Sequence, residues 1–283
     1  MRARVIKKIA DKFLLDGNYF CQARGTLKEQ GIFVGDEVEF NKRDLVIEKV
    51  YERKNLLVRP PLANLDRMII VIAPVPKPDL SLVDKLLIFC KINGILPVIC
   101  VNKCDILAQD EKNKLERIYA PLAKLVFVSA EHGQVDELKK QIKGVCAFAG
   151  QSAVGKSSLI NALHGEVKEE VGSLAKKTER GKQTTRIVSL YKLGAKDYIA
   201  DTAGFSKLDE ALLGIEAREL CEYFDEFTPY IRFCKYLSCS HIKEVGCSVK
   251  AALKENKISL ERYESYKKIY ENLKGIKKYE KKN

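Results

Sequence analysis

The segment with the clearest chemistry in this chain is GQSAVGKS, residues 150–157. It follows the apolar run VCAFA and precedes a segment with a helical pattern, which is the context of a phosphate-binding loop. Glycines let the backbone approach a phosphate, and successive N–H groups can then point at it. We expect Lys156 to reach the β- and γ-phosphates and Ser157 to bind Mg²⁺. The residues predicted to hold the nucleotide here are Gly150, Gln151, Ser152, Ala153, Val154, Gly155, Lys156, Ser157 and Ser158.

A second motif, NKCD at residues 102–105, follows the apolar run PVICV. The carboxylate of Asp105 can accept hydrogen bonds from the N1–H and the 2-amino group of guanine. Adenine lacks those donors and would leave the carboxylate unpaired, which is costly, so Asp105 argues against an ATP-dependent protein. We expect Asn102 and Lys103 to hold the loop and cover the base, while Cys104 occupies a permissive position. With the phosphate loop, this motif predicts a guanine nucleotide site.

Two shorter motifs extend the predicted site. Ser129 and Ala130 end the apolar run LVFV, where a base-contacting loop would lie. The motif DTAG, residues 201–204, follows the run YIA. Asp201 can hold Mg²⁺ through a water molecule, and the N–H of Gly204 can sense the γ-phosphate.

The order of the motifs is unusual. Residues 171–186 carry the adjacent Thr184 and Thr185, and one of the two hydroxyls is expected to complete the Mg²⁺ shell when the γ-phosphate is present; the sequence leaves open which one. Most GTPases run phosphate loop, threonine segment, DxxG, NKxD and SA, whereas NKxD and SA come first here. Neighbouring termini make such a rearrangement tolerable, so the order predicts a circular permutation.

A possible metal site lies further along the chain, where Cys234, Cys239, His241 and Cys247 are spaced C-x4-C-x-H-x5-C. Three thiolates and one imidazole form a closed tetrahedral zinc site of the structural type. The spacing is not that of a standard finger, so buried thiols are the alternative. That alternative fits the cysteines in apolar runs, which are Cys21, Cys90, Cys100, Cys146 and Cys221.

Composition limits the class of protein. The 283 residues are 46% hydrophobic, enough for two or three domains with real cores. Nine cysteines, an odd number, indicate a reducing cytosol rather than a disulfide framework. No apolar stretch approaches the roughly 18 residues of a membrane span, and the N-terminus lacks the apolar region of a secretory signal. We therefore expect a cytoplasmic protein that binds no membrane. The net charge of +12 suggests an anionic partner. His132 and His164 have no partner signature, and we assign them no role.

The pattern of the chain divides into three parts. Residues 1–58 hold short runs separated by glycines, which predicts a barrel of about five strands, such as an OB-fold. Strand and helix signals alternate over residues 67–200, which predicts a parallel sheet covered by helices. Residues 209–283 are mainly helical, with an acidic start and a basic end. The apolar residues that roughly share one helical face in that start are Leu212, Ile215, Leu220, Phe224 and Phe227.

These patterns predict individual elements. The predicted strands are residues 3–9, 18–24, 36–40, 45–50, 67–73, 97–101, 125–128, 145–149, 186–192 and 197–200. The predicted helices are residues 80–93, 109–119, 135–142, 156–164 and 250–278, the last broken near 257–259.

With these motifs in this order, the chain resembles the RsgA (YjeQ/YloQ) family of circularly permuted, small-ribosomal-subunit-dependent GTPases. The resemblance extends from VGDEVEF and RKNLLVRPPLANLDRMIIVIA through RGKQTTR to HIKEVGCSVKAALKENKISLERYESYKKI. It implies an OB-fold at 1–62, a permuted GTPase domain at 63–208 and a helical zinc domain at 209–283. It also implies GTP hydrolysis with Mg²⁺, one structural zinc ion, and binding to the small ribosomal subunit and its 16S rRNA during late maturation. Hydrolysis would be stimulated by the subunit, and we expect a monomer.

The chain departs from the family pattern at the switch motifs. The family shows histidine before the paired threonines, where this chain has Gln183, and DxPG, where this chain has Ala203. Phe205 stands where many GTPases place a glutamine that orients water, and an apolar side chain cannot do so. The catalytic candidates are therefore Lys156, Gln183, Thr184 and Thr185. The alternative function is an RNA-binding ribosome assembly chaperone in which nucleotide sets the conformation and hydrolysis is incidental.

Overall fold

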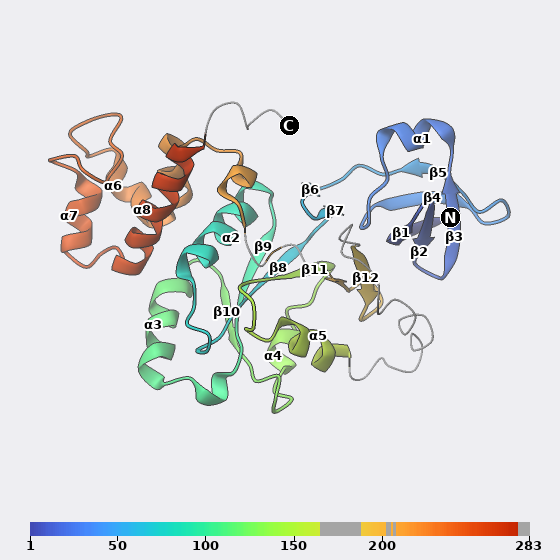
Figure 1. Cartoon of the computed structure of the whole chain (residues 1–283), viewed down its shortest axis with the longest axis horizontal. Helices are drawn as coiled ribbons and strands as arrows, with labels where there is room; N and C mark the ends of the chain where they lie inside the picture. The colour runs from blue at the N-terminus through green and yellow to red at the C-terminus, as the bar shows by residue number, and fades with distance from the viewer. Residues whose placement is uncertain (165–187, 202–204, 206–207, 277–283) are drawn as a thin grey trace.

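The computed structural model describes residues 1–164, 188–201, 205 and 208–276, and Figure 1 shows three parts along this chain. A β-barrel lies at the N-terminal end, an α/β sheet in the middle and a helical region at the C-terminal end, as the sequence predicted. Among the residues described, no helix is long and apolar enough to cross a membrane.

The N-terminal barrel closes in the strand order β1-β2-β3-β5-β4-β1. All neighbours are antiparallel except β3 and β5, which run parallel. This is the arrangement of an OB-fold, and its interior is filled by alternating apolar residues such as Val5, Leu15 and Ile47. The elements are β1 (Arg2–Ile9), β2 (Lys12–Leu15), β3 (Tyr19–Ala23), α1 (Gly25–Gln30), β4 (Glu37–Asn41) and β5 (Val46–Val50).

The strand β2, the helix α1 and the two-stranded hairpin after the barrel were not predicted. The turn from β1 to β2 is made by Ala10 at φ 53°, so the sequence carries no glycine signal there. Helix α1 begins at Gly25, a residue that normally indicates a break. After the barrel, β6 (Leu56–Val58) and β7 (Pro61–Ala63) form a hairpin where we expected only a boundary. Its residue Leu62 is buried in the central core.

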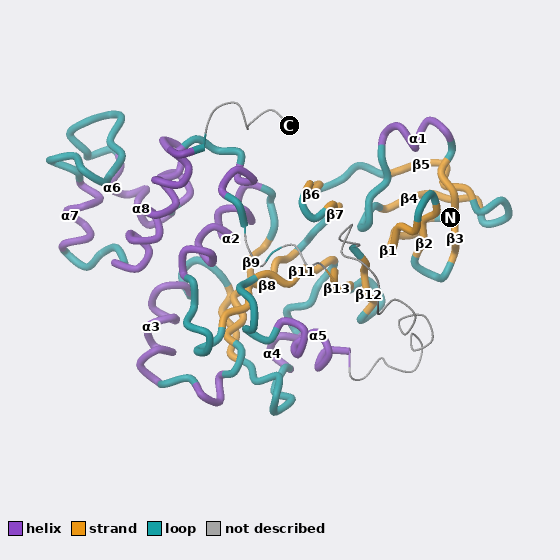
Figure 2. Tube along the Cα trace, viewed as in Figure 1, coloured by secondary structure: helices purple, strands orange, loops and turns teal. Residues whose placement is uncertain are grey.

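The central sheet has the strand order β10-β9-β8-β11-β13-β12. The first five strands run parallel, and β12 is antiparallel to β13. One residue pair, Lys7 with Ser189, continues the sheet into the barrel, and Figure 2 shows this run of strands. The strands are β8 (Arg67–Ile72), β9 (Leu96–Val101), β10 (Lys124–Phe127), β11 (Val145–Ala149), β12 (Ser189–Lys192) and β13 (Tyr198–Asp201).

Helices cover both faces of this sheet because the strand residues alternate between two apolar cores. In β8, Met68 and Ile70 join the core that contains α2 and α3, while Ile69 and Val71 join the core of α4 and α5. The helix predicted at 135–142 is much shorter than expected. The helices are α2 (Leu80–Ile92), α3 (Gln109–Tyr119), α4 (Asp136–Lys139) and α5 (Lys156–His164).

The C-terminal region is helical, but its acidic start does not form the single helical face suggested by the sequence. It folds instead into three separate 3-10 helices, the first ended by Gly214 at φ 66°. The predicted break near 257–259 separates two helices, of which α8 packs along α2. The elements are η3 (Glu210–Leu213), η4 (Ala217–Tyr223), η5 (Asp225–Phe227), α6 (Thr228–Ile231), α7 (Ser248–Lys254) and α8 (Leu260–Gly275).

Candidate functional site

The predicted nucleotide motifs lie at one edge of the central sheet. Asn102 follows β9, Ser129 follows β10, Gly150 follows β11, and Asp201 is the last residue of β13. These strands are parallel, so their carboxyl ends meet at the same edge. The topology therefore brings together motifs that are up to 100 residues apart in the chain.

The phosphate loop joins β11 to α5 and wraps around its own lysine. The Nζ of Lys156 donates hydrogen bonds of 2.7 Å to the carbonyl oxygens of Gly150 and Gln151. Burial lowers the pKa of Lys156. Gly150 has φ 128°, and a Cβ there would lie 2.1 Å from the carbonyl oxygen of Val71. The close packing of loop and strand thus requires glycine at this position.

One buried amide holds three of the motifs in register. Asn102 donates from Nδ2 to the carbonyl oxygen of Val154 (3.0 Å) and accepts at Oδ1 from the N–H of Ala130 (3.1 Å). Its side chain is packed so tightly that a Cβ on Gly155 would lie 2.2 Å from Nδ2. Asn102 therefore links two loops directly to the phosphate loop: the guanine-type loop, which is NKCD at residues 102–105, and the SA loop, which is Ser129 and Ala130.

Lys103 adds a second link to the phosphate loop and one to the segment that follows β8. Its backbone is in the left-handed region at φ 57°. Its Nζ donates to the carbonyl oxygens of Val75 (2.7 Å) and Ala153 (3.2 Å). The next residue, Cys104, is half-buried, and its backbone N–H donates to the carbonyl oxygen of Val128 (3.0 Å).

The carboxylate of Asp105 lies at the open side of this arrangement. A hydrogen bond from Ser129 holds the pKa of Asp105 below its usual value. The carboxylate is therefore ionised and acceptor-only at neutral pH. Ser129 is itself fully buried, whereas Asp105 is exposed.

Several functional contacts were not foreseen from the sequence. The side chain of Gln151 accepts from the N–H of Asp79 (2.7 Å) and donates to the carbonyl oxygen of Lys77 (3.0 Å), so it joins the phosphate loop to the segment that starts α2. Lys85 of α2 donates to the carbonyl oxygen of Leu208 (2.9 Å). Both side chains contact backbone far along the chain, and spacing gives no signal for such contacts.

The switch residues are only partly covered by the structure. Gln183, Thr184, Thr185 and Gly204 lie outside the described residues, as does Ala203. Phe205 is buried at 1% exposure, with its ring centroid 6.1 Å from that of Phe89. Its place in the core agrees with the expectation that it cannot orient water.

The four predicted metal ligands do come together. Single donor atoms of Cys234, Cys239, His241 and Cys247 all lie within 4.8 Å of one another. The Nδ1 of His241 is 3.5 Å from the sulfur of Cys234 and 3.4 Å from that of Cys247, and these two sulfurs are 4.0 Å apart. Ligand atoms around a tetrahedral zinc ion are about 3.6–3.8 Å apart. The donor set and its spacing therefore fit zinc.

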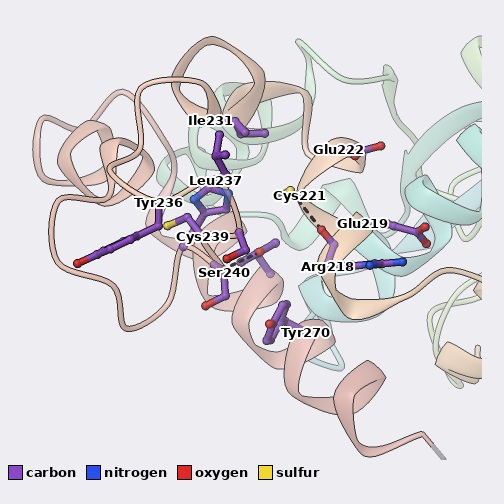
Figure 3. Close-up of a pocket in the computed structure, with 13 residues that line it drawn as sticks. Arg218, Glu219, Cys221, Glu222, Ile231, Tyr236, Leu237, Cys239, Ser240 and Tyr270 are labelled. Atoms are coloured by element: carbon purple, nitrogen blue, oxygen red, sulfur yellow. Dashed lines mark hydrogen bonds between the residues drawn. The ribbon is translucent and has the colours of Figure 1, made fainter. Parts of the chain in front are cut away.

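Buried aromatic residues support this cluster. Tyr263 and Tyr266 of α8 donate to the carbonyl oxygens of His241 (2.7 Å) and Ser240 (2.8 Å). Burial would raise the pKa of Glu244, but hydrogen bonds from Ser240 and nearby backbone lower it to about 2. A cavity of about 470 Å³ borders the cluster, and Figure 3 shows the residues that line it.

The parallel sheet, the phosphate loop at its edge and the NKxD and SA loops earlier in the chain define a circularly permuted P-loop GTPase. A family model described as RsgA GTPase matches residues 50–211. The chain belongs to the RsgA GTPase family, since this match covers more than half of it.

Similar proteins support the same assignment over nearly the whole chain. One from Agathobacter rectalis, named Small ribosomal subunit biogenesis GTPase RsgA, is 38% identical over 272 residues, covering 92% of this chain and 89% of its own. One of the same name from Caldanaerobacter subterraneus subsp. tengcongensis is 37% identical, covering 100% and 99%. The crystal structure of YjeQ from Thermotoga maritima superposes with a TM-score of 0.79 at 33% identity, covering 98% and 99%. That of YloQ, described as a circularly permuted GTPase, gives 0.76 at 27% identity, covering 96% and 94%.

Proposed function

We propose that this chain binds the small ribosomal subunit and its 16S rRNA in late subunit maturation and hydrolyses GTP to GDP and phosphate there, with turnover stimulated by the subunit. The observation that carries the GTP part of the proposal is the link made by Asn102 between the NKCD loop, the Ser129–Ala130 loop and the phosphate loop. The names of the similar proteins point to the small subunit as the partner.

We assign the nucleotide contacts as follows. Asp105 accepts from guanine N1–H and the 2-amino group, and Ser129 and Ala130 border the base. The phosphate loop and Lys156 hold the β- and γ-phosphates. Mg²⁺, when bound, neutralises charge on the phosphates, and its protein partners would be Ser157, Asp201 and Thr184 or Thr185. Gly204 senses the γ-phosphate, and Gln183 positions the attacking water.

We assign a structural zinc ion to the Cys234, Cys239, His241 and Cys247 cluster. A cation among them would let these sulfurs ionise, since burial raises the pKa of the Cys239 thiol to about 12. Zinc there would hold the loop that joins α6 to α7.

The excess of basic side chains supports an RNA partner, and we expect the protein to act in the cytoplasm. The chain carries 50 basic and 38 acidic side chains. An rRNA surface would attract this excess, and the resulting affinity should fall with salt through counterion release. We assign domains to residues 1–62, 63–208 and 209–283 and expect the protein to bind the subunit as a monomer.

The experiment is to measure GTP turnover by the zinc-loaded protein with and without purified small subunits. We expect subunits to raise the rate with GTP but not with ATP, and Lys156→Ala to abolish the stimulated rate. Equal use of ATP would refute the guanine assignment. An unchanged rate with subunits present would refute stimulated hydrolysis.

One observation favours the second function, an RNA-binding assembly chaperone with incidental hydrolysis. Phe205 is buried in the core and leaves the position after the DTAG motif without a polar side chain. In that case nucleotide would change subunit binding, while turnover would stay at its unstimulated rate. Subunit pelleting with GDP and with a non-hydrolysable GTP analogue, run beside the turnover assay, separates the two functions.

A further inference from the structure

His132 has no role in the sequence pattern, yet its ring lies against the hydroxyl that holds Asp105. The Nδ1 of His132 is 3.0 Å from the Oγ of Ser129, and its backbone N–H donates to the same Oγ (3.4 Å). Nδ1 is 3.8 Å from the Oδ1 of Asp105, beyond hydrogen-bond length. The imidazole can therefore act on the carboxylate in two ways, through Ser129 and directly by charge when the ring is protonated.

The turn that carries His132 is closed by backbone hydrogen bonds. Ser129 and Gln134 exchange two backbone hydrogen bonds, of 3.2 and 2.9 Å. Gly133 between them has φ 67°, which closes the turn. The ring is thus presented to Ser129 by a short closed loop, although its side chain is 57% exposed.

The number of available protons decides which atom donates in each of these hydrogen bonds. Ser129 has one hydroxyl proton, and the ionised Asp105 can only accept. A hydrogen bond from Ser129 is the largest cause of the lowered pKa of Asp105, which would use that proton. In that arrangement the Oγ has only lone pairs left for the Nδ1 of His132, 3.0 Å away, and Nδ1 would be the donor. A proton on Nδ1 keeps the hydroxyl aimed at Asp105, whereas a bare Nδ1 would compete for it.

We propose that His132 is a positioning residue for guanine recognition, which donates to Ser129 so that Ser129 holds the carboxylate of Asp105 toward the base. The inference rests on the proposed role of Asp105. It predicts that guanine selectivity, as well as affinity, depends on a hydrogen-bond donor at position 132.

The test compares GDP, IDP and ADP affinities by calorimetry, because IDP lacks the 2-amino group that Asp105 would bind. His132→Leu removes the donor, and His132→Asn keeps an N–H near the Nδ1 position. Glu131→Ala, in the same exposed turn, is the matched control. We expect His132→Leu to weaken GDP binding about fivefold, the typical effect of one hydrogen bond. We also expect the GDP-to-IDP affinity ratio to fall about threefold.

The outcomes separate this inference from the proposed function. Recovery of the affinity ratio by His132→Asn, with Glu131→Ala unchanged, supports positioning. If the unaltered protein prefers GDP over ADP but His132→Leu keeps the same GDP-to-IDP ratio, the role of His132 is overturned and the proposed function stands. If the unaltered protein binds GDP no better than ADP, both are overturned.

Discussion

Replacing Arg262 by methionine should lower the free energy of unfolding by about 3–5 kcal/mol, because it breaks a buried ion pair between the GTPase part and the C-terminal helices. Its guanidinium donates to the carboxylates of Asp84 on α2 (2.5 Å) and Glu226 on η5 (2.7 and 3.1 Å). The side chains of Arg262 and Asp84 are only 5% and 1% exposed. Methionine fills a similar volume but leaves the acid of Asp84 buried without a cation, which accounts for the size of the penalty.

The penalty should also depend on pH. Burial already raises the pKa of Asp84 to about 6, despite the neighbouring Arg262. Without the guanidinium this pKa should rise further above the value of about 3.9 in the unfolded chain. The folded variant would then keep a proton that the unfolded chain releases, so its stability falls as pH rises through the raised pKa. The difference from the unaltered protein should therefore be larger at pH 7.5 than at pH 5.5.

Urea unfolding of the zinc-loaded protein, followed by far-ultraviolet circular dichroism, measures both effects. The matched control is Lys91→Met, which breaks an exposed ion pair between α2 and Asp225 and should cost at most about 1 kcal/mol. A double variant, Asp84→Asn with Arg262→Met, removes the buried Asp84–Arg262 pair and leaves only the partly exposed carboxylate of Glu226, so it should recover most of the lost stability. The reasoning fails if Arg262→Met costs no more than Lys91→Met, or if the double variant is less stable than Arg262→Met.

Two further predictions concern the C-terminal region. Burial would raise the pKa of Glu261, but hydrogen bonds from Lys114 and Ser259 lower it from 4.5 to about 2. Glu261→Gln should therefore lower the free energy of unfolding by about 1 kcal/mol at pH 7. The difference from the unaltered protein should disappear as pH falls from 4.5 toward 2. Urea unfolding across that range measures it, and a constant difference would contradict the assignment. Metal analysis should find one zinc ion per chain, and a chelator should remove hydrogen-exchange protection from the segment around Cys239 while sparing the barrel. Equal protection in that segment before and after chelation would contradict a structural zinc site.

Much of the fold follows from local patterns. The alternating strands, the helices α2, α3 and α5 and the break before α8 lie close to where the periodicity predicts them. The elements that were missed lack local signals. The β1–β2 turn uses Ala10 rather than glycine. The apolar residues of η3 to η5 stand at nearly helical spacing, yet Phe224 and Phe227 pack against Tyr266 of α8 instead of forming one helical face.

The residues of the site also fall into two groups, those that have a local sequence signal and those that do not. Residue type and spacing already selected the phosphate loop, NKxD, SA and the cysteine and histidine cluster, because each motif needs particular atoms at short separations along the chain. The partners of Gln151, Arg262 and His132 were not predictable, since each contact depends on how a side chain packs after folding.

The sequence by itself determined which chemical groups this protein carries. They are a carboxylate suited to guanine, a phosphate loop and a cluster of three cysteines and a histidine, and each is recognisable from a short motif. Only the tertiary structure decided how these groups act together. Parallel strands bring distant motifs to one edge, Asn102 holds them in register, and a buried arginine joins α8 to α2. The reason is physical, because hydrogen bonds and buried charges depend on distances in space, which local spacing does not set.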